Sequence, residues 1–265
     1  MENMLEIENL TLAYHKKPIL ENFNLSVGRG DIYGIIGNNG VGKTTLLKAI
    51  TGLLRYKQGK ITIHAEGRKK PLIGTIIEKP GLFKDMSAYE NIKAKALLLG
   101  VKYKKKNIAQ LLQKVGLGDV GRKRTGAFSM GMKQRLGIAL ALVGEPDILV
   151  LDEPINGLDP QGINEVRNLL LKIYEETGLT MLISSHILGE LSRIATHFLV
   201  MGKGGRIIRN CTKEEFMKEC GEENIDDYYV KLVEQAETTQ NWESTDSVET
   251  PQDRENEDST PPRAE

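Results

Sequence analysis

The sequence is poor in cysteine and contains no long apolar run. Its 265 residues include two cysteines, Cys211 and Cys220, and no CxxC pair. Neither a disulfide framework nor a cysteine-based zinc site is indicated, and a reducing cytosol is the expected compartment. No apolar run approaches the roughly 20 residues that span a bilayer, and the first residues, MENMLEIENL, lack the pattern of a signal peptide. We expect a chain that does not cross a membrane by itself.

A net charge is absent as well, because 36 basic residues balance 36 acidic residues. The balance hides a split along the chain. From Gly221 onward there are 14 acidic and 3 basic residues, a net charge of −11. Residues 1–220 therefore hold 33 basic and 22 acidic residues, a net charge of +11. This distribution predicts a basic globular body that carries an acidic tail.

The apolar pattern predicts an α/β domain. Apolar residues make up 40% of the chain, which is enough for a sizeable core. Alternation over Leu5–Val27 predicts antiparallel strands, and continuous apolar runs at 31–37, 147–152 and 180–185 predict buried parallel strands. Further elements are expected as a strand at 60–65, a hairpin at 198–209, and helices at 44–52, 161–176, from 213 onward, and in an arm at about 85–143.

Two boundaries divide the chain. Residues 1–220 are expected to form the α/β domain, 221–237 a C-terminal helical extension, and 238–265 an acidic tail. The tail is rich in Glu, Asp, Ser, Thr and Pro, so it cannot bury enough apolar surface to offset the entropy of ordering. We expect the tail to be disordered.

A glycine-rich loop between a predicted strand and a predicted helix matches the pattern GxxxxGK[ST]. The loop consists of Gly37, Asn38, Asn39, Gly40, Val41, Gly42, Lys43 and Thr44. Its glycines let backbone N–H groups turn toward a β-phosphate, and the helix N-terminus adds its dipole. Lys43 is expected to reach the β- and γ-phosphates, and the Thr44 hydroxyl to bind Mg²⁺. The loop therefore predicts a site for the phosphates of a nucleotide and for magnesium.

Two carboxylates follow a predicted buried strand, in the sequence ILVLDEP at 148–154. Ligands of parallel sheets bind at the carboxyl ends of the strands. We expect Asp152 to hold the Mg²⁺ shell, and Glu153 to orient or deprotonate the attacking water. Together with the glycine-rich loop, this pair is typical of a P-loop NTPase.

A third segment, FSMGMKQR at 128–135, narrows the family. It resembles the signature of ATP-binding cassette (ABC) proteins, usually LSGGQ followed by QR, and it lies between the two earlier motifs as it does in that family. The sequence NGLDP at 156–160 resembles the family's D-loop, and His186, after a strand that ends in Ser-Ser, matches its switch histidine. The chain is identified as a member of the ABC family over residues 5–220.

The resemblance implies a fold, an activity and a dimer. The fold is an α/β nucleotide-binding domain with a P-loop core, a mainly parallel sheet, an antiparallel β edge and a helical arm. Two subunits hydrolyse ATP while they hold it between them, and Ser129, Gly131 and Asp159 act on the nucleotide of the facing subunit. The resemblance also implies that His186 contacts the γ-phosphate, that Thr45 belongs to the nucleotide site, and that Tyr14 stacks on adenine. A histidine bonded only to backbone and a core tyrosine remain the alternatives for His186 and Tyr14.

Three positions depart from the usual family pattern. Met130 replaces the first glycine of the signature, and Met132 stands where its glutamine usually is. Glu78, in IIEKPG, stands where most members have a glutamine that binds Mg²⁺ and water. With MSAYEN at 86–91, these features resemble the branch for bacitracin resistance and lantibiotic immunity, which expels antimicrobial peptides. A solvated loop residue is the alternative for Glu78.

The function implied by the resemblance is ATP hydrolysis that powers peptide expulsion through a separate membrane permease. We expect contact with this permease at residues 79–100, a location on the inner face of the cell membrane, and no nucleic-acid partner. The second subunit of the dimer is either a copy of this chain or another cassette. Two alternatives stay open: a module that senses peptide antibiotics with a kinase, and a soluble ABC ATPase without transport. Proteins of the latter kind usually carry two cassettes or a long coiled coil, and this chain has neither.

Overall fold

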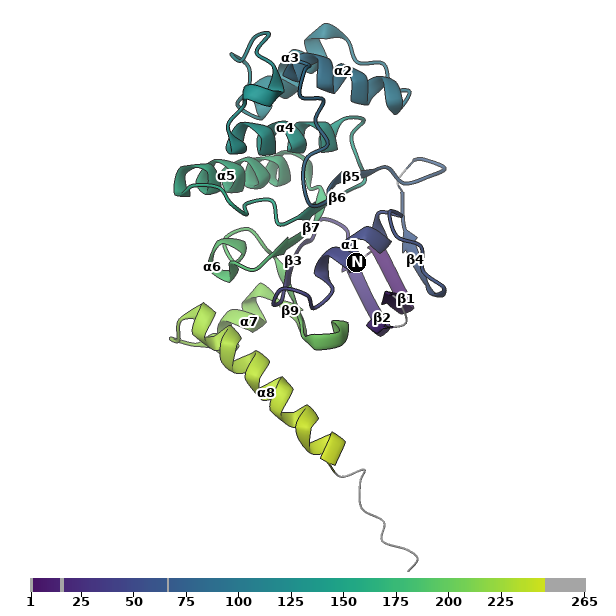
Figure 1. Cartoon of the computed structure of the whole chain (residues 1–265), viewed down its shortest axis with the longest axis vertical. Coiled ribbons are helices and arrows are strands. Elements are labelled where there is room, and N and C mark those ends of the chain that lie inside the picture. Colours follow the sequence, from purple (N-terminus) through teal and green to yellow (C-terminus); the bar gives the residue numbers. More distant parts are fainter. Residues whose placement is uncertain (1, 15–16, 66, 246–265) are drawn as a thin grey trace, which may run out of the picture.

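The computed structural model describes residues 2–14, 17–65 and 67–245, without the side chains of Tyr14, Lys17 and 239–245. The described chain forms two sheets and a set of helices (Figure 1). Within the described residues, no helix combines the length and the apolar character that a membrane span needs.

A three-stranded antiparallel sheet forms one side of the domain. It has the order β2-β1-β4 and consists of β1 (Asn3–Tyr14), β2 (Lys17–Gly28) and β4 (Gln58–Ile63). Alternation places residues such as Leu5, Ile7 and Leu25 inside, where they pack with Leu46 and Leu47 of helix α1 (Lys43–Ile50). The predicted antiparallel edge is confirmed, and it is a separate sheet.

A six-stranded sheet with the order β5-β6-β7-β3-β8-β9 lies at the centre. Its strands are β3 (Ile32–Ile36), β5 (Ile73–Ile76), β6 (Ile148–Asp152), β7 (Thr180–Ser185), β8 (His197–Met201) and β9 (Ile207–Thr212). All neighbouring pairs are parallel except β8 with β9. The mainly parallel sheet of a P-loop NTPase is thereby confirmed.

Strand β5 was not anticipated from the sequence. It is only four residues long and contains Gly74, so it shows too little apolar periodicity. A Cβ at Gly74 would lie 2.3 Å from the carbonyl oxygen of Ala141, which shows that helix α4 (Met130–Leu142) crosses the strand at close range. Contact with the helical arm explains the glycine.

Alternate residues of the central strands face two different cores. On β3, Ile32 and Ile36 join one apolar cluster, and Tyr33 and Ile35 join the other. The first cluster includes the helical arm and α5 (Pro160–Thr177), and the second includes α1 and the small sheet. The central sheet is therefore covered on both faces, as its continuous apolar strands require.

The predicted helical arm consists of α2 (Ala88–Leu98), α3 (Lys105–Lys114) and α4 (Met130–Leu142), at the top of Figure 1. Helix α2 begins with a capping box, in which Ser87 accepts from the Glu90 N–H and the Glu90 carboxylate accepts from Ser87. Three short elements, η1 (Thr125–Ala127), α6 (Leu188–Leu191) and η2 (Lys203–Gly205), lie in connections.

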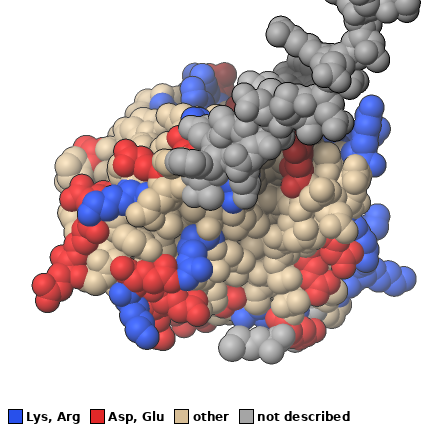
Figure 2. Space-filling model, turned by 90° about the horizontal axis from the view of Figure 1, so that it is seen from below, with Lys and Arg blue, Asp and Glu red and all other residues tan. Residues whose placement is uncertain are grey.

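The chain continues into α7 (Lys213–Cys220) and α8 (Ile225–Thr245), at the bottom of Figure 1. Helix α8 continues past residue 237 into the segment that the sequence assigned to the disordered tail, which was expected to start at residue 238. No proline or glycine interrupts 238–245, so hydrogen bonds within the helix can continue it without an apolar face. The rest of the predicted tail, 246–265, lies outside the described residues. On the face seen from below, acidic and basic side chains of the described residues lie side by side (Figure 2).

Candidate functional site

Three predicted motifs meet at the carboxyl ends of the central strands. The glycine-rich loop follows β3, the carboxylate pair ends β6, and His186 follows β7. Because β3, β7 and β6 are neighbours, with Asp152 opposite Ser184 in register, the three motifs lie against one another. In parallel sheets this edge is where ligands bind.

The glycine-rich loop wraps around the side chain of Lys43. The Lys43 Nζ donates to the Gly37 carbonyl at 2.6 Å and to the Asn38 carbonyl at 3.5 Å. Gly40 and Gly42 have φ values of 86° and 113°, which only glycine adopts readily, and Gly42 is the N-cap of α1. No acidic residue lies in the first turn of α1. The helix N-terminus and the buried ammonium group of Lys43 are therefore suited to hold an anion.

Asp152 is held by two hydroxyl groups. The Thr44 Oγ1 donates to its Oδ2 at 2.9 Å, and the Ser184 Oγ donates to its Oδ1 at 2.7 Å. Asp152 is only 4% exposed, so these bonds fix its carboxylate beside the start of α1. Hydroxyl and carboxylate oxygens suit Mg²⁺, which usually takes one or two protein ligands and completes its shell with water and phosphate. Thr44 and Asp152 fit such a role.

Glu153 lies between Lys43 of the glycine-rich loop and His186. Its Oε1 is 3.5 Å from the Lys43 Nζ, and its Oε2 is 2.8 Å from the His186 Nδ1. Its backbone has a φ of 48°, which is unusual for a residue with a side chain and is often found at functional sites. The Glu153 N–H donates to the Ser184 Oγ at 2.9 Å, which holds the residue in this conformation.

Glu78 pairs with a lysine of α1. Its Oε1 is 2.5 Å from the Lys48 Nζ, and Glu78 has a φ of 62°. The hydrogen bond from Lys48, and then the charge of Lys48, hold the pKa of the Glu78 carboxyl below its usual value. The side chain is 64% exposed. In this structure Glu78 thus connects the loop after β5 to the helix that begins at the phosphate site.

Ser129 and Asp159 cap helices away from the acidic pair. The Ser129 Oγ accepts from the Met132 N–H at 3.2 Å at the start of α4, and the Asp159 Oδ1 accepts from the Gly162 N–H at 3.0 Å at the start of α5. Both residues are exposed. A Cβ at Gly131 would meet no atom of this chain within 4 Å. Within one chain these three residues do not join the cluster around Lys43.

Met130 links the signature segment to the D-loop. A Cβ at Gly157 would lie 3.1 Å from the Met130 Cε, so the methionine side chain covers the Gly157 backbone. Gly157 has a φ of 72°. Because Met130 replaces the usual first glycine of the signature, its side chain brings the signature segment into contact with the D-loop of the same chain.

A cleft of about 740 Å³ opens beside the phosphate loop. The loop residues Asn38, Asn39, Gly40 and Val41 line it together with Thr45, Pro18, Ile19, Met201, Gly202, Lys203, Gly204, Val233 and Glu237. Its volume lies in the range of about 300–1,000 Å³ that is typical of small-molecule sites. Tyr14 ends β1 opposite Lys17, near the start of the β2 segment that lines the cleft, but its side chain lies outside the described part.

The sequence did not identify Ser184, Lys48 or the contribution of α8. The signal for Ser184 was a hydroxyl residue at the end of an otherwise apolar strand, next in the sheet to the strand that ends with a carboxylate pair. The interaction of Lys48 with Glu78 and the approach of α8 to the cleft depend on how distant segments pack. No local pattern indicates them.

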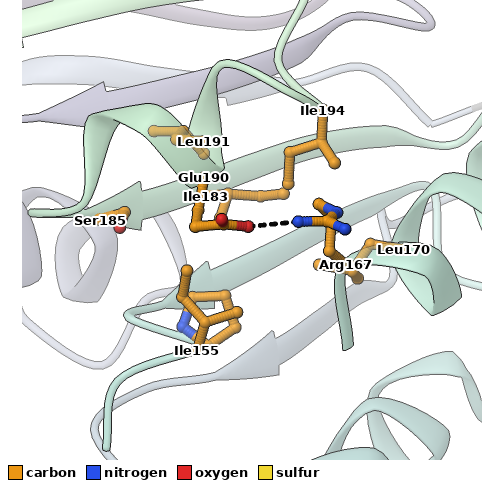
Figure 3. Close-up of a pocket in the computed structure, with 9 residues that line it drawn as sticks. Ile155, Arg167, Leu170, Ile183, Ser185, Glu190, Leu191 and Ile194 are labelled. Atoms are coloured by element: carbon orange, nitrogen blue, oxygen red, sulfur yellow. Dashed lines mark hydrogen bonds and ion pairs between the residues drawn. The ribbon is translucent and has the colours of Figure 1, made fainter. Parts of the chain in front are cut away.

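A second cavity lies between α5, β7 and α6 (Figure 3). Its volume is about 10 Å³, and the Arg167 Nη1 and the Glu190 Oε2, 2.5 Å apart, form an ion pair across it. This space is at the lower limit for one water molecule, about 10–15 Å³. The cavity is part of the packing between α5 and α6 and is not a substrate site.

Comparison with known sequences agrees with this arrangement. The ABC transporter family matches residues 20–156. The chain is 45% identical over 205 residues to the lantibiotic transport ATP-binding protein SrtF of Streptococcus pyogenes, and the match covers 76% of the chain and 88% of SrtF. It is 41% identical over 210 residues to the bacitracin transport ATP-binding protein BcrA of Bacillus licheniformis, with coverage of 77% and 68%.

Solved structures have the same fold. The cbiO1 protein of Clostridium perfringens, part of the ABC transporter complex cbiONQ, superposes with a TM-score of 0.71 at 30% identity and covers 83% of this chain and 92% of its own. An ATP-binding subunit of an ABC transporter superposes with a TM-score of 0.74 at 28% identity, with coverage of 86% and 99%.

Proposed function

The chain belongs to the ABC transporter family as an ATP-binding subunit that hydrolyses ATP, and we propose that it powers the expulsion of an antimicrobial peptide through a separate membrane permease. The observation that carries the nucleotide chemistry is the cluster of Lys43, Asp152, Glu153 and His186 at the carboxyl ends of three neighbouring strands. The peptide substrate is supported by the relatives and by the signature segment.

Binding of ATP begins at the phosphate loop. The Lys43 Nζ now satisfies the carbonyls of Gly37 and Asn38, and on nucleotide binding it turns to the β- and γ-phosphate oxygens. Backbone N–H groups of the loop and the start of α1 hold the same phosphates. Thr44 and Asp152 would hold Mg²⁺, which supplies charge neutralisation to the phosphates when bound. Thr45 lines the cleft just beyond the loop.

Glu153 is the group that orients the attacking water and accepts its proton. Its position beside Lys43 places a carboxylate within reach of the γ-phosphate side of the loop. His186 holds the second oxygen of Glu153 and fixes the direction of the carboxylate. When nucleotide is bound, His186 is then in place to contact the γ-phosphate.

A second subunit completes the site. Ser129, Gly131 and Asp159 are exposed or half-buried around the N-termini of α4 and α5, outside the cluster of their own chain. The open space at Gly131 leaves room for a phosphate of a facing subunit. We therefore assign these three residues to the nucleotide bound by the partner subunit, whether that subunit is a copy of this chain or another cassette.

We assign the permease contact to residues 79–100. Four large apolar side chains in this segment are exposed, namely Phe83, Met86, Leu97 and Leu98. Two of them precede α2 and two end it, so large apolar side chains are available to a partner at both ends of this helix. The segment follows Glu78, which connects it to α1 through Lys48, so movement at the nucleotide site has a direct route to this surface. This contact would place the chain on the inner face of the membrane.

The substrate class rests on the relatives that carry lantibiotic and bacitracin transport in their names, together with Met130, Met132 and Glu78. The test is to express the chain with its permease in peptide-sensitive cells and to measure survival and peptide retention. We expect resistance with the wild type and none with Glu153→Gln. Co-purification of a histidine kinase without peptide expulsion would favour the sensing module, and ATPase activity without any membrane partner would favour the soluble alternative.

A further inference from the structure

Helix α8 reaches the phosphate loop, although it lies outside residues 20–156 that match the family. The Tyr229 hydroxyl donates to the Asn38 Oδ1 at 3.4 Å. Asn38 is the second residue of the glycine-rich loop, so a residue 191 positions later in the chain touches the nucleotide site directly. None of the catalytic roles discussed above uses this contact.

The position of α8 is fixed by aromatic packing on the central sheet. Phe216 of α7 packs against Phe198 of β8 with ring centroids 4.9 Å apart, and Tyr228 packs edge-on against Phe216 at 5.2 Å. The Tyr228 hydroxyl also donates to Glu219 at 3.0 Å. These contacts hold the first turns of α8, so the following turns keep their place beside the loop.

One face of α8 forms a wall of the cleft. Tyr229, Val233 and Glu237 are spaced by four residues, and this spacing places them on the same side of a helix. Val233 is only 8% exposed and lines the cleft, and Glu237 lines it while it pairs with Lys203 at 3.2 Å. We call these three residues the inner face of α8. Val230 and Glu234 are exposed.

We propose that the inner face of α8 closes the nucleoside end of the ATP site and determines how tightly the nucleoside is held. Lys43 and the loop N–H groups fix the phosphates, so the remaining part of the cleft takes the ribose and the base. Its walls there include Pro18, Ile19 and Val233, which offer apolar surface to a flat ring. The proposal rests on the assignment of the phosphate loop as the nucleotide site.

The test compares ADP with inorganic pyrophosphate, because pyrophosphate occupies the phosphate loop without a nucleoside. Equilibrium dissociation constants are measured by calorimetry for the wild type, Val233→Ala and the matched control Val230→Ala. Loss of apolar contact at one side chain should weaken ADP binding by about three- to tenfold in Val233→Ala. Pyrophosphate affinity should stay within about twofold, and Val230→Ala should match the wild type for both ligands.

If Val233→Ala does not fold, ADP and pyrophosphate affinities are measured instead for Val233→Thr and its control Val230→Thr, because threonine keeps the shape of valine. ADP affinity equal to wild type in the Val233 variants would overturn the proposal, and so would tighter ADP binding, which would make α8 an obstruction. An equal loss for pyrophosphate would also overturn it, because the effect would then come from the phosphate loop. Lys43→Ala tests the assignment of the phosphate loop separately from the proposal for α8. If this variant binds ADP and pyrophosphate as tightly as the wild type, the phosphate loop is not the nucleotide site, and this conclusion does not depend on α8.

Discussion

The phosphate loop region and the signature region differ in how much of their chemistry is complete within one chain. Around the loop, Lys43 and Asp152 are buried and Glu153 is largely covered, and hydrogen bonds and ion pairs link them to Thr44, Ser184 and His186. In the signature region, Ser129 and Asp159 are exposed, and their described bonds cap their own helices. The polar groups of the phosphate loop region are held in place by bonds within their own chain. Those of the signature region lie on the exposed surface.

This difference has a physical origin. Buried polar groups must be paired, so the cluster around Asp152 forms as the sheet folds. A helix N-terminus satisfies only part of its N–H groups with its cap and leaves the rest directed at solvent or at a partner. The polar groups of the first region are therefore held in place by their own chain, and the second region is the surface that we assign to the nucleotide of a facing subunit.

The largest expected effect comes from Glu153→Gln, which keeps the shape of the phosphate region but removes its base. Turnover should fall by about 10²–10⁴-fold, since general-base catalysis is worth that much. ATP binding should persist, and the ATP-bound dimer should accumulate on gel filtration. The steady-state ATPase rate checks the first point. A rate equal to wild type would show that Glu153 is not the base.

Lys43→Ala should strongly weaken ATP binding, because it deletes the ammonium group at the centre of the phosphate loop. A charge-assisted hydrogen bond contributes about 1.5–3 kcal/mol, which corresponds to a loss of about 10- to 150-fold in ATP affinity. Calorimetric titration with ATP measures the loss. Lys48→Ala on the same helix is the control, since Lys48 pairs with Glu78 and does not contact the loop carbonyls. Affinity close to wild type in Lys43→Ala would contradict the role of Lys43.

Ser129→Ala distinguishes two roles for Ser129, a helix cap and a contact to the nucleotide of the facing subunit, because each role predicts a different result. As a helix cap alone, the change should lower the free energy of unfolding by about 0.5–2 kcal/mol and leave turnover intact. As a contact to the nucleotide of the facing subunit, it should also slow turnover by about tenfold while ATP binding to the monomer stays unchanged. We expect the second result.

Thr212→Ala is the matched control for Ser129→Ala. Thr212 caps α7 in the same manner, with its side chain accepting from the Glu215 N–H. It should lose comparable stability without an effect on the ATPase rate. If both variants have the same turnover, Ser129 is only a cap.

Glu78→Gln should have the smallest effect, because its side chain is exposed and its described partner is Lys48. The variant should fold and keep ATPase activity with a modest change in rate, and its larger loss should appear in peptide resistance. Glu78→Ala should lower both. Wild-type behaviour of Glu78→Ala in both assays would reduce Glu78 to a solvated loop residue.

The same pair also predicts a dependence on pH. The carboxyl of Glu78 has a lowered pKa, so its pairing with Lys48 stabilises the fold above the pKa of the unfolded chain. This contribution is lost as the pH falls through the lowered pKa. It should be small, because the pair is exposed to solvent. Thermal melting of wild type and Glu78→Gln across the acidic range would show whether the two curves converge.

Much of the site was predictable because its parts are contiguous in the sequence. The strand, the glycine-rich loop and the helix that follows it are one segment, and Asp152 and Glu153 end a continuous apolar strand. Two elements could not be predicted from the sequence. Strand β5 is too short to show a hydrophobic period, and the end of α8 has no apolar face and so gives no periodic signal.

The sequence by itself determined the P-loop chemistry, the α/β fold and the family, because each depends on residue type and spacing within short segments. Only the tertiary structure decided which distant groups meet: Ser184 bridging Asp152 and Glu153, Lys48 pairing with Glu78, and α8 beside Asn38. These contacts arise from the order of strands in the sheet and from the packing of α7 and α8 on it. A linear pattern carries no record of such packing, because it joins residues that are far apart along the chain.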